Sequence, residues 1–403
     1  MSEISKLESE REALLKAARR IVIKLGTSTV TGPQGDLSAE RVRPIANSIA
    51  SLIKSGRQVV LVSSGAVGLG RGWLGLHASR LGDLVTKQAC AAVGQSLLMD
   101  AYKDLFAESQ VKIAQVLLTE EDFTNWRRYS NLRRTMEKLL GFGVLPIVNE
   151  NDTVSTAELE SVAAGSRTPA FSDNDRLAAL VMSGMEADAL VLMTNVDGLL
   201  RLTSDRAKGN GCAQAGTSPA EVIPLVTEVT PGLKLLAAGP SESGRGGMRT
   251  KVEAAEIAMN CGGIAVIANG QEPQALDRIF AGEKLGTAFL PSKRMRGKRR
   301  WIAYAADVRG KVVVDAGAYR AIADRKASLL ASGVVRVESH FAPLDVVSIL
   351  DAEGREFARG IANCASDVAE QAARRKKSAS AGKGTTASPV LVTRDNIVLL
   401  TKP

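Results

Sequence analysis

Two lysines stand where a lysine is locally unfavourable, so each is a candidate for binding an anion. Lys24 directly follows the apolar run 21–23 and precedes the small polar turn 26–28. A continuous apolar run that ends in a turn is typical of a strand buried on both faces. Lys251 ends the glycine-rich stretch "GRGGMRTK" and falls in the first turn of an expected helix, where a cation opposes the helix dipole. The simpler alternatives are a Lys24 ammonium that reaches solvent from the strand end and a solvent-facing Lys251.

Acids, carboxamides and hydroxyls gather in four further segments: "SSGAVGLG" (63–70), "NENDTVST" (149–156), "FSDNDRLAAL" (171–180) and "TNVDGLL" (194–200). A Ser172 or Asp173 placed before a helix can also be only an N-cap. The two histidines, His77 and His340, lie outside these segments, which argues against Ser-His-Asp or Cys-His catalysis there. The sequence contains no His/Cys cluster that would provide a zinc site, and no residue is assigned as a metal ligand. The remaining lysines, acids, amides and glycines suit phosphoryl transfer, where catalysis is mainly positioning and charge stabilisation.

The elements that must position these residues alternate along the first 292 residues. Amphipathic helical patterns, such as 38–56 and 86–109, separate six expected strands at 20–25, 58–63, 111–118, 143–149, 189–195 and 263–269. Alternation of this kind predicts a mainly parallel sheet covered by helices on both faces. Ligands bind at the carboxyl ends of the strands in such sheets. Lys24 lies at one of those ends.

The pattern changes after residue 300. Short strands are expected in "KVVVD", "GVVRVES", "DVVSILD" and "EFARGIAN", and their close spacing predicts a small β-rich second domain. The Lys/Ser/Gly-rich segment 376–389 is typical of a loop. We therefore expect an N-terminal helical extension at 1–19, an α/β domain at 20–292, a basic linker at 293–309 and the β-rich domain at 310–403.

Composition narrows the function classes. The net charge of +9 is local, because six cations in "KRMRGKRR" (293–300) and four in "RRKK" (374–377) leave about −1 for the rest. These runs are either solvated linker and helix surfaces or a phosphate-binding patch. Aromatic residues make up only 4%, which argues against a stacking surface for single-stranded nucleic acid. No apolar run approaches the roughly 20 residues of a membrane span, and four scattered cysteines indicate reduced thiols in a cytoplasmic protein.

Six motifs together carry a family resemblance: "VIKLGTS", "VSSGAVGLG", "TKQACAAVGQ", "PIVNENDTV", "SDNDRLAA" and "GGMRTK". Their order and spacing resemble the amino-acid kinase family, and in particular its members that phosphorylate L-glutamate. The C-terminal segment resembles a PUA domain. The resemblance implies a three-layer αβα sandwich with a mainly parallel sheet, followed by a small β-rich PUA-like domain. It also implies transfer of phosphate from ATP, with Mg²⁺, to the γ-carboxylate of L-glutamate, giving L-glutamyl 5-phosphate in the first step of proline biosynthesis.

The resemblance further implies a role for each matching residue. Lys24, Lys251 and Asp175 would be catalytic, with the aspartate organising the two lysines. Glutamate would be held by Ser64, Asp152 and Asn174. The ATP-binding positions would be Lys24, Thr194, Asn195, Arg245, Gly246, Gly247, Met248, Arg249, Thr250 and Lys251. Two ammonium groups flanking the transferred phosphoryl group would offset charge on its oxygens.

The sequence departs from the family pattern at three places in the kinase-like segment, and the last part of the PUA-like region is also atypical, with its Lys/Ser/Gly-rich loop. Asn195 stands where an aspartate is usual, Arg245 replaces a threonine, and the segment 158–171 is longer than is typical. Two other functions stay open. One is a sister kinase acting on acetylglutamate, aspartate or UMP, and the other is an RNA-binding protein with a degenerate kinase domain. Expected partners are a second copy of the chain, a glutamyl-phosphate reductase and RNA at the PUA-like domain, but no membrane.

Overall fold

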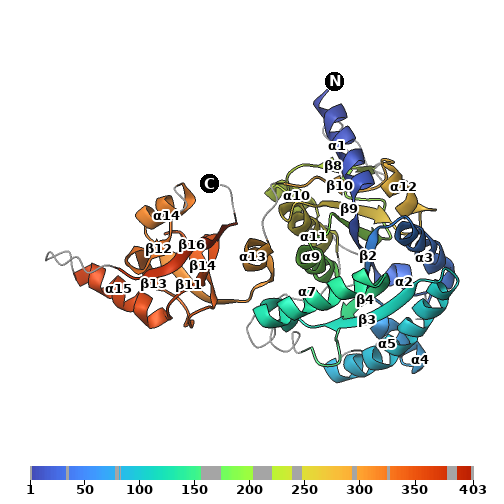
Figure 1. Ribbon diagram of the computed structural model, residues 1–403, viewed down its shortest axis with the longest axis horizontal. Helices are drawn as coiled ribbons and strands as arrows, with labels where there is room; N and C mark the ends of the chain where they lie inside the picture. Colours follow the sequence, from blue (N-terminus) through green and yellow to red (C-terminus); the bar gives the residue numbers. More distant parts are fainter. Residues whose placement is uncertain are drawn as a thin grey trace, which may run out of the picture. The chain divides into compact units, whose positions relative to one another are not determined.

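The chain forms two compact units in a computed structural model (Figure 1). The first unit comprises Met1–Asp122 and Arg127–Arg294, and the second comprises Phe123–Trp126 and Met295–Pro403. The structure describes residues 2–32, 36–77, 81, 83–155, 174–202, 220–237, 247–292, 297–324, 327–378 and 388–400. No helix in these ranges has the length and apolar character needed to cross a membrane.

An eight-stranded sheet forms the middle of the first unit, in the order β3-β4-β2-β1-β5-β9-β10-β8. The strands are β1 (Arg20–Leu25), β2 (Gln58–Ser63), β3 (Lys112–Leu118), β4 (Val144–Glu150), β5 (Ala189–Thr194), β8 (Leu225–Val226), β9 (Ile264–Asn269) and β10 (Thr287–Phe289). Only the β9–β10 pair is antiparallel, and β6 (Leu200–Leu202) and β7 (Ala220–Val222) form a separate ribbon. The six expected strands are present, and the prediction of a mainly parallel sheet is confirmed. Strand β1 is buried from Ile21 to Leu25, as the apolar run predicts.

Helices cover both faces of this sheet (Figure 1). One face packs against α1 (Glu3–Ala17), α3 (Ala39–Lys54), α5 (Leu84–Ala107) and α12 (Ala275–Ala281), whose apolar residues share a core with alternate residues of the strands. The opposite face carries α9 (Asn174–Met185) and α11 (Met248–Asn260). The remaining helices are α2 (Thr27–Val30), α4 (Ala66–Trp73), α6 (Glu121–Thr124), α7 (Trp126–Gly141) and α10 (Pro231–Leu236). The expected three-layer αβα sandwich is therefore confirmed.

Helices α4 and α5 cross at a pair of glycines. A Cβ atom on Gly70 would lie 1.8 Å from the Cys90 carbonyl oxygen, and one on Gly94 would lie 1.7 Å from the Ala66 carbonyl oxygen. Both distances are far inside van der Waals contact, so any side chain at either position would force the helices apart. Backbone contact thus fixes α5 against α4, the helix that begins directly after β2.

The second unit is built on a six-stranded sheet in the order β12-β16-β15-β14-β11-β13. Its strands are β11 (Val308–Val314), β12 (Leu329–Leu330), β13 (Val334–Val337), β14 (Val346–Leu350), β15 (Glu356–Ala362) and β16 (Val390–Leu399). Its helical segments are α13 (Gly297–Arg300), the π-helical turn Trp301–Ala305, α14 (Ala316–Ala323), the 3₁₀ turn Ala331–Gly333 and α15 (Ser366–Ser378). A core of its own, centred on Val347, Ile349 and Leu391, supports the sheet. The expected β-rich C-terminal domain is confirmed.

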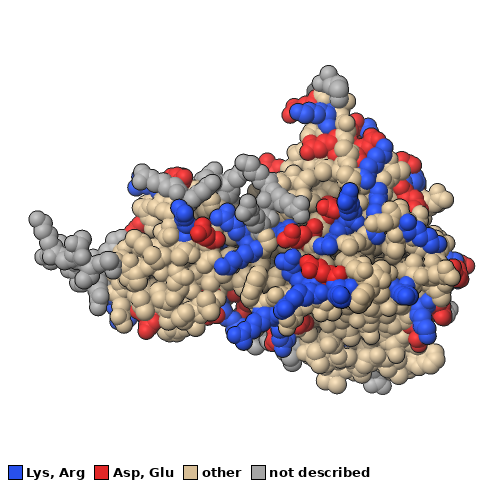
Figure 2. Space-filling view, viewed as in Figure 1, with Lys and Arg blue, Asp and Glu red and all other residues tan. Residues whose placement is uncertain are grey.

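Both basic runs are helical where the structure describes them: residues 297–300 lie in α13 and residues 374–377 lie in α15. Residues 297–300 of the first run form α13, and Arg300 is buried. Residues 293–296 lie outside the described residues. The expected loop 376–389 begins later than predicted, because α15 continues to Ser378; residues 379–387 are outside the described part of the chain. Elsewhere, basic and acidic side chains alternate over the first unit (Figure 2), with ion pairs such as Lys16–Glu12 and Arg128–Glu121.

Candidate active site

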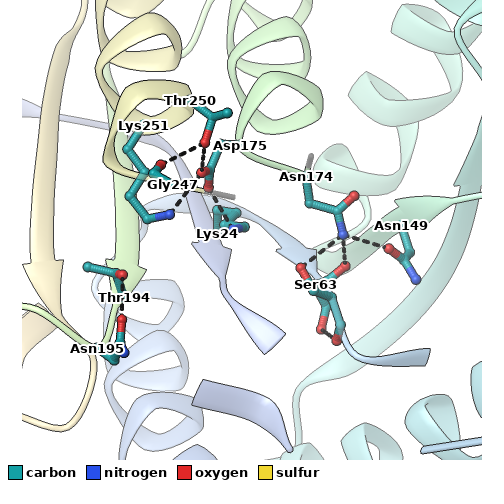
Figure 3. Close-up of polar contacts among 11 residues, drawn as sticks. Lys24, Ser63, Asn149, Asn174, Asp175, Thr194, Asn195, Gly247, Thr250 and Lys251 are labelled. Carbon is teal, nitrogen blue, oxygen red and sulfur yellow. Dashed lines mark hydrogen bonds and ion pairs between the residues drawn. The ribbon is translucent and has the colours of Figure 1, made fainter. Parts of the chain in front are cut away.

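Both candidate lysines meet one carboxylate at the carboxyl edge of the sheet (Figure 3). Lys24 lies near the end of β1, Asp175 in the first turn of α9 and Lys251 in the first turn of α11. Asp175 Oδ1 is 2.6 Å from Lys24 Nζ, and its Oδ2 is 3.0 Å from Lys251 Nζ. Asp175 is fully buried, and the two lysines are only 4% and 6% exposed. One carboxylate therefore holds two ammonium groups side by side.

The charge of this cluster indicates an anionic ligand. The ammonium groups of Lys24 and Lys251 meet at one shared carboxylate, so a phosphate group placed against them would accept charge-assisted hydrogen bonds from both. The N-terminus of α11 begins beside the same carboxylate: Thr250 Oγ1 is 3.0 Å from Asp175 Oδ2 and 2.9 Å from the Gly247 carbonyl oxygen. Backbone N–H groups at a helix N-terminus favour phosphate. The arrangement suits the charge that develops on a phosphoryl group during transfer.

A second polar network lies beside the cluster, between β2, β4 and the start of α9 (Figure 3). Asn174 Nδ2 lies 2.8 Å from the Ser63 carbonyl oxygen, 3.0 Å from Ser64 Oγ and 2.9 Å from Asn149 Oδ1. Asn149 Nδ2 donates to Gln95 Oε1 at 2.9 Å. The turn from β2 into α4 passes through Gly65, whose φ of +105° suits glycine. Because Asn174 and Asp175 are adjacent, the network and the lysine cluster are parts of one site.

Comparison with known proteins identifies the family. The sequence model described as "Amino acid kinase family" matches residues 19–268, more than half of the chain. The chain belongs to the amino acid kinase family. It is accordingly a phosphotransferase, with ATP as co-substrate. The model described as "PUA domain" matches residues 310–381, so the resemblance to both families is confirmed.

Several relatives cover most of this amino acid kinase. A protein named glutamate 5-kinase from Moorella thermoacetica is 43% identical over 88% of this chain and 89% of its own. Its namesake from Myxococcus xanthus is 44% identical over 89% and 90%, respectively. Another, from Citrifermentans bemidjiense, is 41% identical over 97% of this chain and all of its own. Among solved structures, a UMP kinase from Bacillus anthracis is 18% identical with a TM-score of 0.44, over 68% of this chain and 96% of that one.

Some of the residues that we expected to bind ATP lie at the lysine–aspartate cluster. Thr194 ends β5, and its Oγ1 donates to Asn195 Oδ1 at 3.3 Å. Met248 begins α11, and Arg249 next to it pairs with Glu253 at 2.9 Å on the exposed side of that helix. Arg245 and Gly246, together with Ser172, Asp173 and the long segment 158–171, lie outside the described residues.

The structure brings together some of the residues that we expected to bind the substrate glutamate. Ser64 and Asn174 share a hydrogen bond. Asp152 lies in the turn that follows β4, at the same edge of the sheet, because β4 pairs in parallel with β2. In the described part of the kinase domain, no group of three or more His, Cys, Asp or Glu side chains is placed to hold a metal ion.

Four polar residues of this kinase domain were missed by the sequence-based prediction of the site. Gln95 and Asn149 belong to the polar network around Asn174, which we call the carboxamide network. Ser63 Oγ forms a 2.7 Å hydrogen bond with the Tyr102 hydroxyl behind it. Burial raises the pKa of the Tyr102 hydroxyl above its ordinary value of about 10. Gln95 and Asn149 both fall within the motifs quoted above, but nothing in their spacing separates them from ordinary polar residues.

Proposed function

We propose that this kinase transfers the γ-phosphoryl group of ATP to the γ-carboxylate of L-glutamate, giving L-glutamyl 5-phosphate and ADP. This would be the first step of proline biosynthesis. The observation that carries the proposal is the cluster in which Lys24 and Lys251 share the buried carboxylate of Asp175. The names of the relatives supply the acceptor.

The chemistry needs little more than position and charge. A carboxylate oxygen of glutamate attacks the γ-phosphorus, a new O–P bond forms, and the bond to the β-phosphate oxygen breaks. The acceptor is already ionised at neutral pH, so no general base is required. Negative charge moves onto the transferred phosphoryl oxygens and the leaving oxygen, and the ammonium groups of Lys24 and Lys251 stabilise it. Asp175 keeps those two groups at a fixed separation.

The two substrates would occupy opposite sides of the lysine cluster. On the nucleotide side we place Thr194, Asn195 and the N-terminus of α11, which includes Gly247 and Thr250. On the acceptor side we place Ser64, Asn174 and Asp152. Ser64 Oγ can donate to a substrate carboxylate, and the Asp152 carboxylate can pair with the substrate ammonium. Arg245 and Gly246 complete the nucleotide loop in this proposal.

We also propose that Mg²⁺ enters with ATP. Asp175 lies between two ammonium groups, so its carboxylate is not available to a cation. Mg²⁺ in kinases is commonly held by substrate phosphates, waters and one or two carboxylates. Glu150, the last residue of β4, is the acid that we assign to the ion on the acceptor side, where the ion would offset phosphate charge.

The expected partners and location are proposals as well. A second copy of the chain is one proposed partner, and the family resemblance is what supports it. A glutamyl-phosphate reductase would consume the reactive acyl phosphate. The PUA domain supports RNA as a ligand of the second unit. A cytoplasmic location is supported by the free thiols of Cys90 and Cys261, both buried.

An assay with several acceptors tests the proposed function. ADP release is measured with ATP and Mg²⁺ against glutamate, N-acetylglutamate, aspartate and UMP, and hydroxylamine traps any acyl phosphate. We expect turnover with glutamate, formation of the hydroxamate and little turnover with the others. The Asp175→Asn variant reports contaminating kinases, because it should lose most of the activity. Preference for another acceptor would overturn the assignment to glutamate, and absence of all turnover would favour the RNA-binding alternative.

A further inference from the structure

Gln95 closes the carboxamide network at its buried end. Its side chain comes from α5, is 9% exposed and accepts from Asn149 Nδ2 through Oε1. Its own Nε2 is buried and has no hydrogen-bond partner among the described residues. A buried unpaired donor is unfavourable by about 1–3 kcal/mol. A leucine or methionine would fill this place without that penalty, so packing alone does not explain a glutamine.

The network has a fixed direction, because one of its members cannot rotate. The Ser63 carbonyl is a backbone acceptor, so Asn174 must turn its Nδ2 toward it. Asn149 must then present Oδ1 to Asn174, since two N–H groups cannot face each other. That leaves Asn149 Nδ2 directed at residue 95, where only an acceptor can receive it. The Gln95 Oε1 atom meets that requirement.

The same direction determines what the network offers to a ligand. Asn174 Nδ2 has two hydrogens for three nearby acceptors: the Ser63 carbonyl oxygen, Asn149 Oδ1 and Ser64 Oγ. When the first two take them, the Ser64 hydroxyl stays available to an anionic group. Within the described residues Asn174 Oδ1 accepts no hydrogen bond, which leaves it for an N–H donor such as an α-ammonium. A rotated Asn149 would present its Nδ2 to Asn174 Nδ2. The repulsion between these two donors would displace Asn174 toward Ser64 Oγ, which is its remaining side-chain acceptor.

We propose that Gln95 is a positioning residue for the acceptor: its Oε1 holds Asn149, and Asn149 in turn orients Asn174 toward the substrate. The inference rests on the proposed function, in which Asn174 and Ser64 bind glutamate. The position of Gln95 is itself well fixed, since the preceding residue, Gly94, contacts the backbone of α4. Gln95 acts through Asn149 and touches no reacting atom.

Two substitutions at Gln95 separate positioning from packing. Gln95→Met keeps the volume and removes the acceptor, whereas Gln95→Glu keeps an acceptor oxygen but buries an ionisable group. Positioning predicts that Gln95→Met raises the glutamate KM about tenfold, the effect of one misplaced hydrogen bond, and leaves the ATP KM within about twofold. Gln95→Glu should have a glutamate KM between those of Gln95→Met and the wild type, although its Tm should be the lowest. A packing role predicts the opposite: the variant with the lowest Tm would have the highest glutamate KM, so Gln95→Glu would exceed Gln95→Met.

Leu98→Met, in the buried face of the same helix, is the matched control and should leave both KM values unchanged. The experiment uses the full chain, with steady-state kinetics in each substrate and a thermal melt. A glutamate KM within twofold of wild type in Gln95→Met, or equal rises in both KM values, would overturn the inference. If Gln95→Glu does not fold, the comparison of Gln95→Met with Leu98→Met still decides. Wild-type turnover tests the proposed function separately, and if another acceptor is preferred, the same comparison is made with the KM of that acceptor.

Discussion

Lys24 Nζ lies 2.6 Å from Asp175 Oδ1, and both side chains are buried. A lysine that only reached solvent from a strand end would not have such a partner, so the solvent-reaching alternative for Lys24 is wrong. The same is true of Lys251, whose ammonium lies 3.0 Å from the other oxygen of that carboxylate. Each lysine therefore contributes to the stability of the fold and, in the proposed function, to catalysis.

Removal of the Lys24 charge should affect both properties. In Lys24→Met we expect kcat to fall by about 10²–10³, because one preorganised donor to the transferred phosphoryl group is lost. The ATP KM should change less, because the N-terminus of α11 still binds the phosphates. The free energy of unfolding should also fall, since Asp175 keeps one ammonium partner of two. Enzyme kinetics and a denaturant titration measure the two effects.

The double variant Lys24→Met/Lys251→Met should lose less activity than the product of the single losses, since both lysines act on one phosphoryl group. Lys16→Met, which removes an exposed lysine from α1, is the control and should change neither property appreciably. A folded Lys24→Met enzyme with near-normal kcat would refute the catalytic role of Lys24.

Asp152 should govern affinity for the acceptor. Asp152→Asn removes the counter-charge proposed for the substrate ammonium, so the glutamate KM should rise by about tenfold or more while the ATP KM stays nearly constant. Initial rates over a grid of both substrate concentrations give the two values. Asp104→Asn, at an exposed position of α5, controls for the general loss of a carboxylate. A raised ATP KM with an unchanged glutamate KM would show that the turn after β4 serves the nucleotide instead.

A chain ending at Ser292 should keep the phosphoryl-transfer activity, because every proposed catalytic residue precedes that position. It should also melt at a lower temperature than the full chain. Trp301 Nε1 donates to the Phe123 carbonyl oxygen at 2.8 Å, and this hydrogen bond is lost when residue 301 is removed. Kinetics and thermal melts of both chains test the prediction, with Trp301→Phe in the full chain as the control for the lost N–H donor. A truncated chain that folds but has no turnover would show that phosphoryl transfer needs the second unit.

Alkaline pH should destabilise the protein through Tyr102. Burial raises the pKa of this hydroxyl in the folded state, so the folded chain keeps a proton that the unfolded chain releases above about pH 10. The stabilisation is complete below that pH and is lost as the pH rises toward the folded-state pKa. Urea titrations at pH 8 and pH 11 should show a smaller decrease in the free energy of unfolding for Tyr102→Phe than for the wild type. Equal decreases would mean that other groups cause the alkaline loss.

Much of the fold was predictable because its strands are buried on both faces. An unbroken apolar run, such as Ile21–Ile23, specifies that environment without help from the rest of the chain. Strand β16 was missed because its middle, from Thr393 to Asn396, is polar and only partly buried or exposed. It is a strand because β12 and β15 pair with it.

Some residues of the candidate site were likewise predictable from the local sequence, and others were not. Lys24 and Lys251 attract notice because each is unfavourable in its local setting, and the resemblance supplied the residues around them. Gln95 and Asn149 are ordinary in a helix and at a strand end. Their significance lies in a hydrogen bond between residues 54 positions apart, which no local pattern encodes.

The three tryptophans of the chain are divided between the two units. Trp126 and Trp301 form an edge-to-face pair in the second unit, with ring centroids 5.2 Å apart, and Trp73 is largely exposed at the end of α4. Of these three, only Trp301 is buried, so a red shift in the intrinsic fluorescence on mild denaturation will report the separation of this pair. The shift in emission is thus a natural optical probe of the second unit, because Trp73 of the first unit is already exposed to solvent in the folded chain.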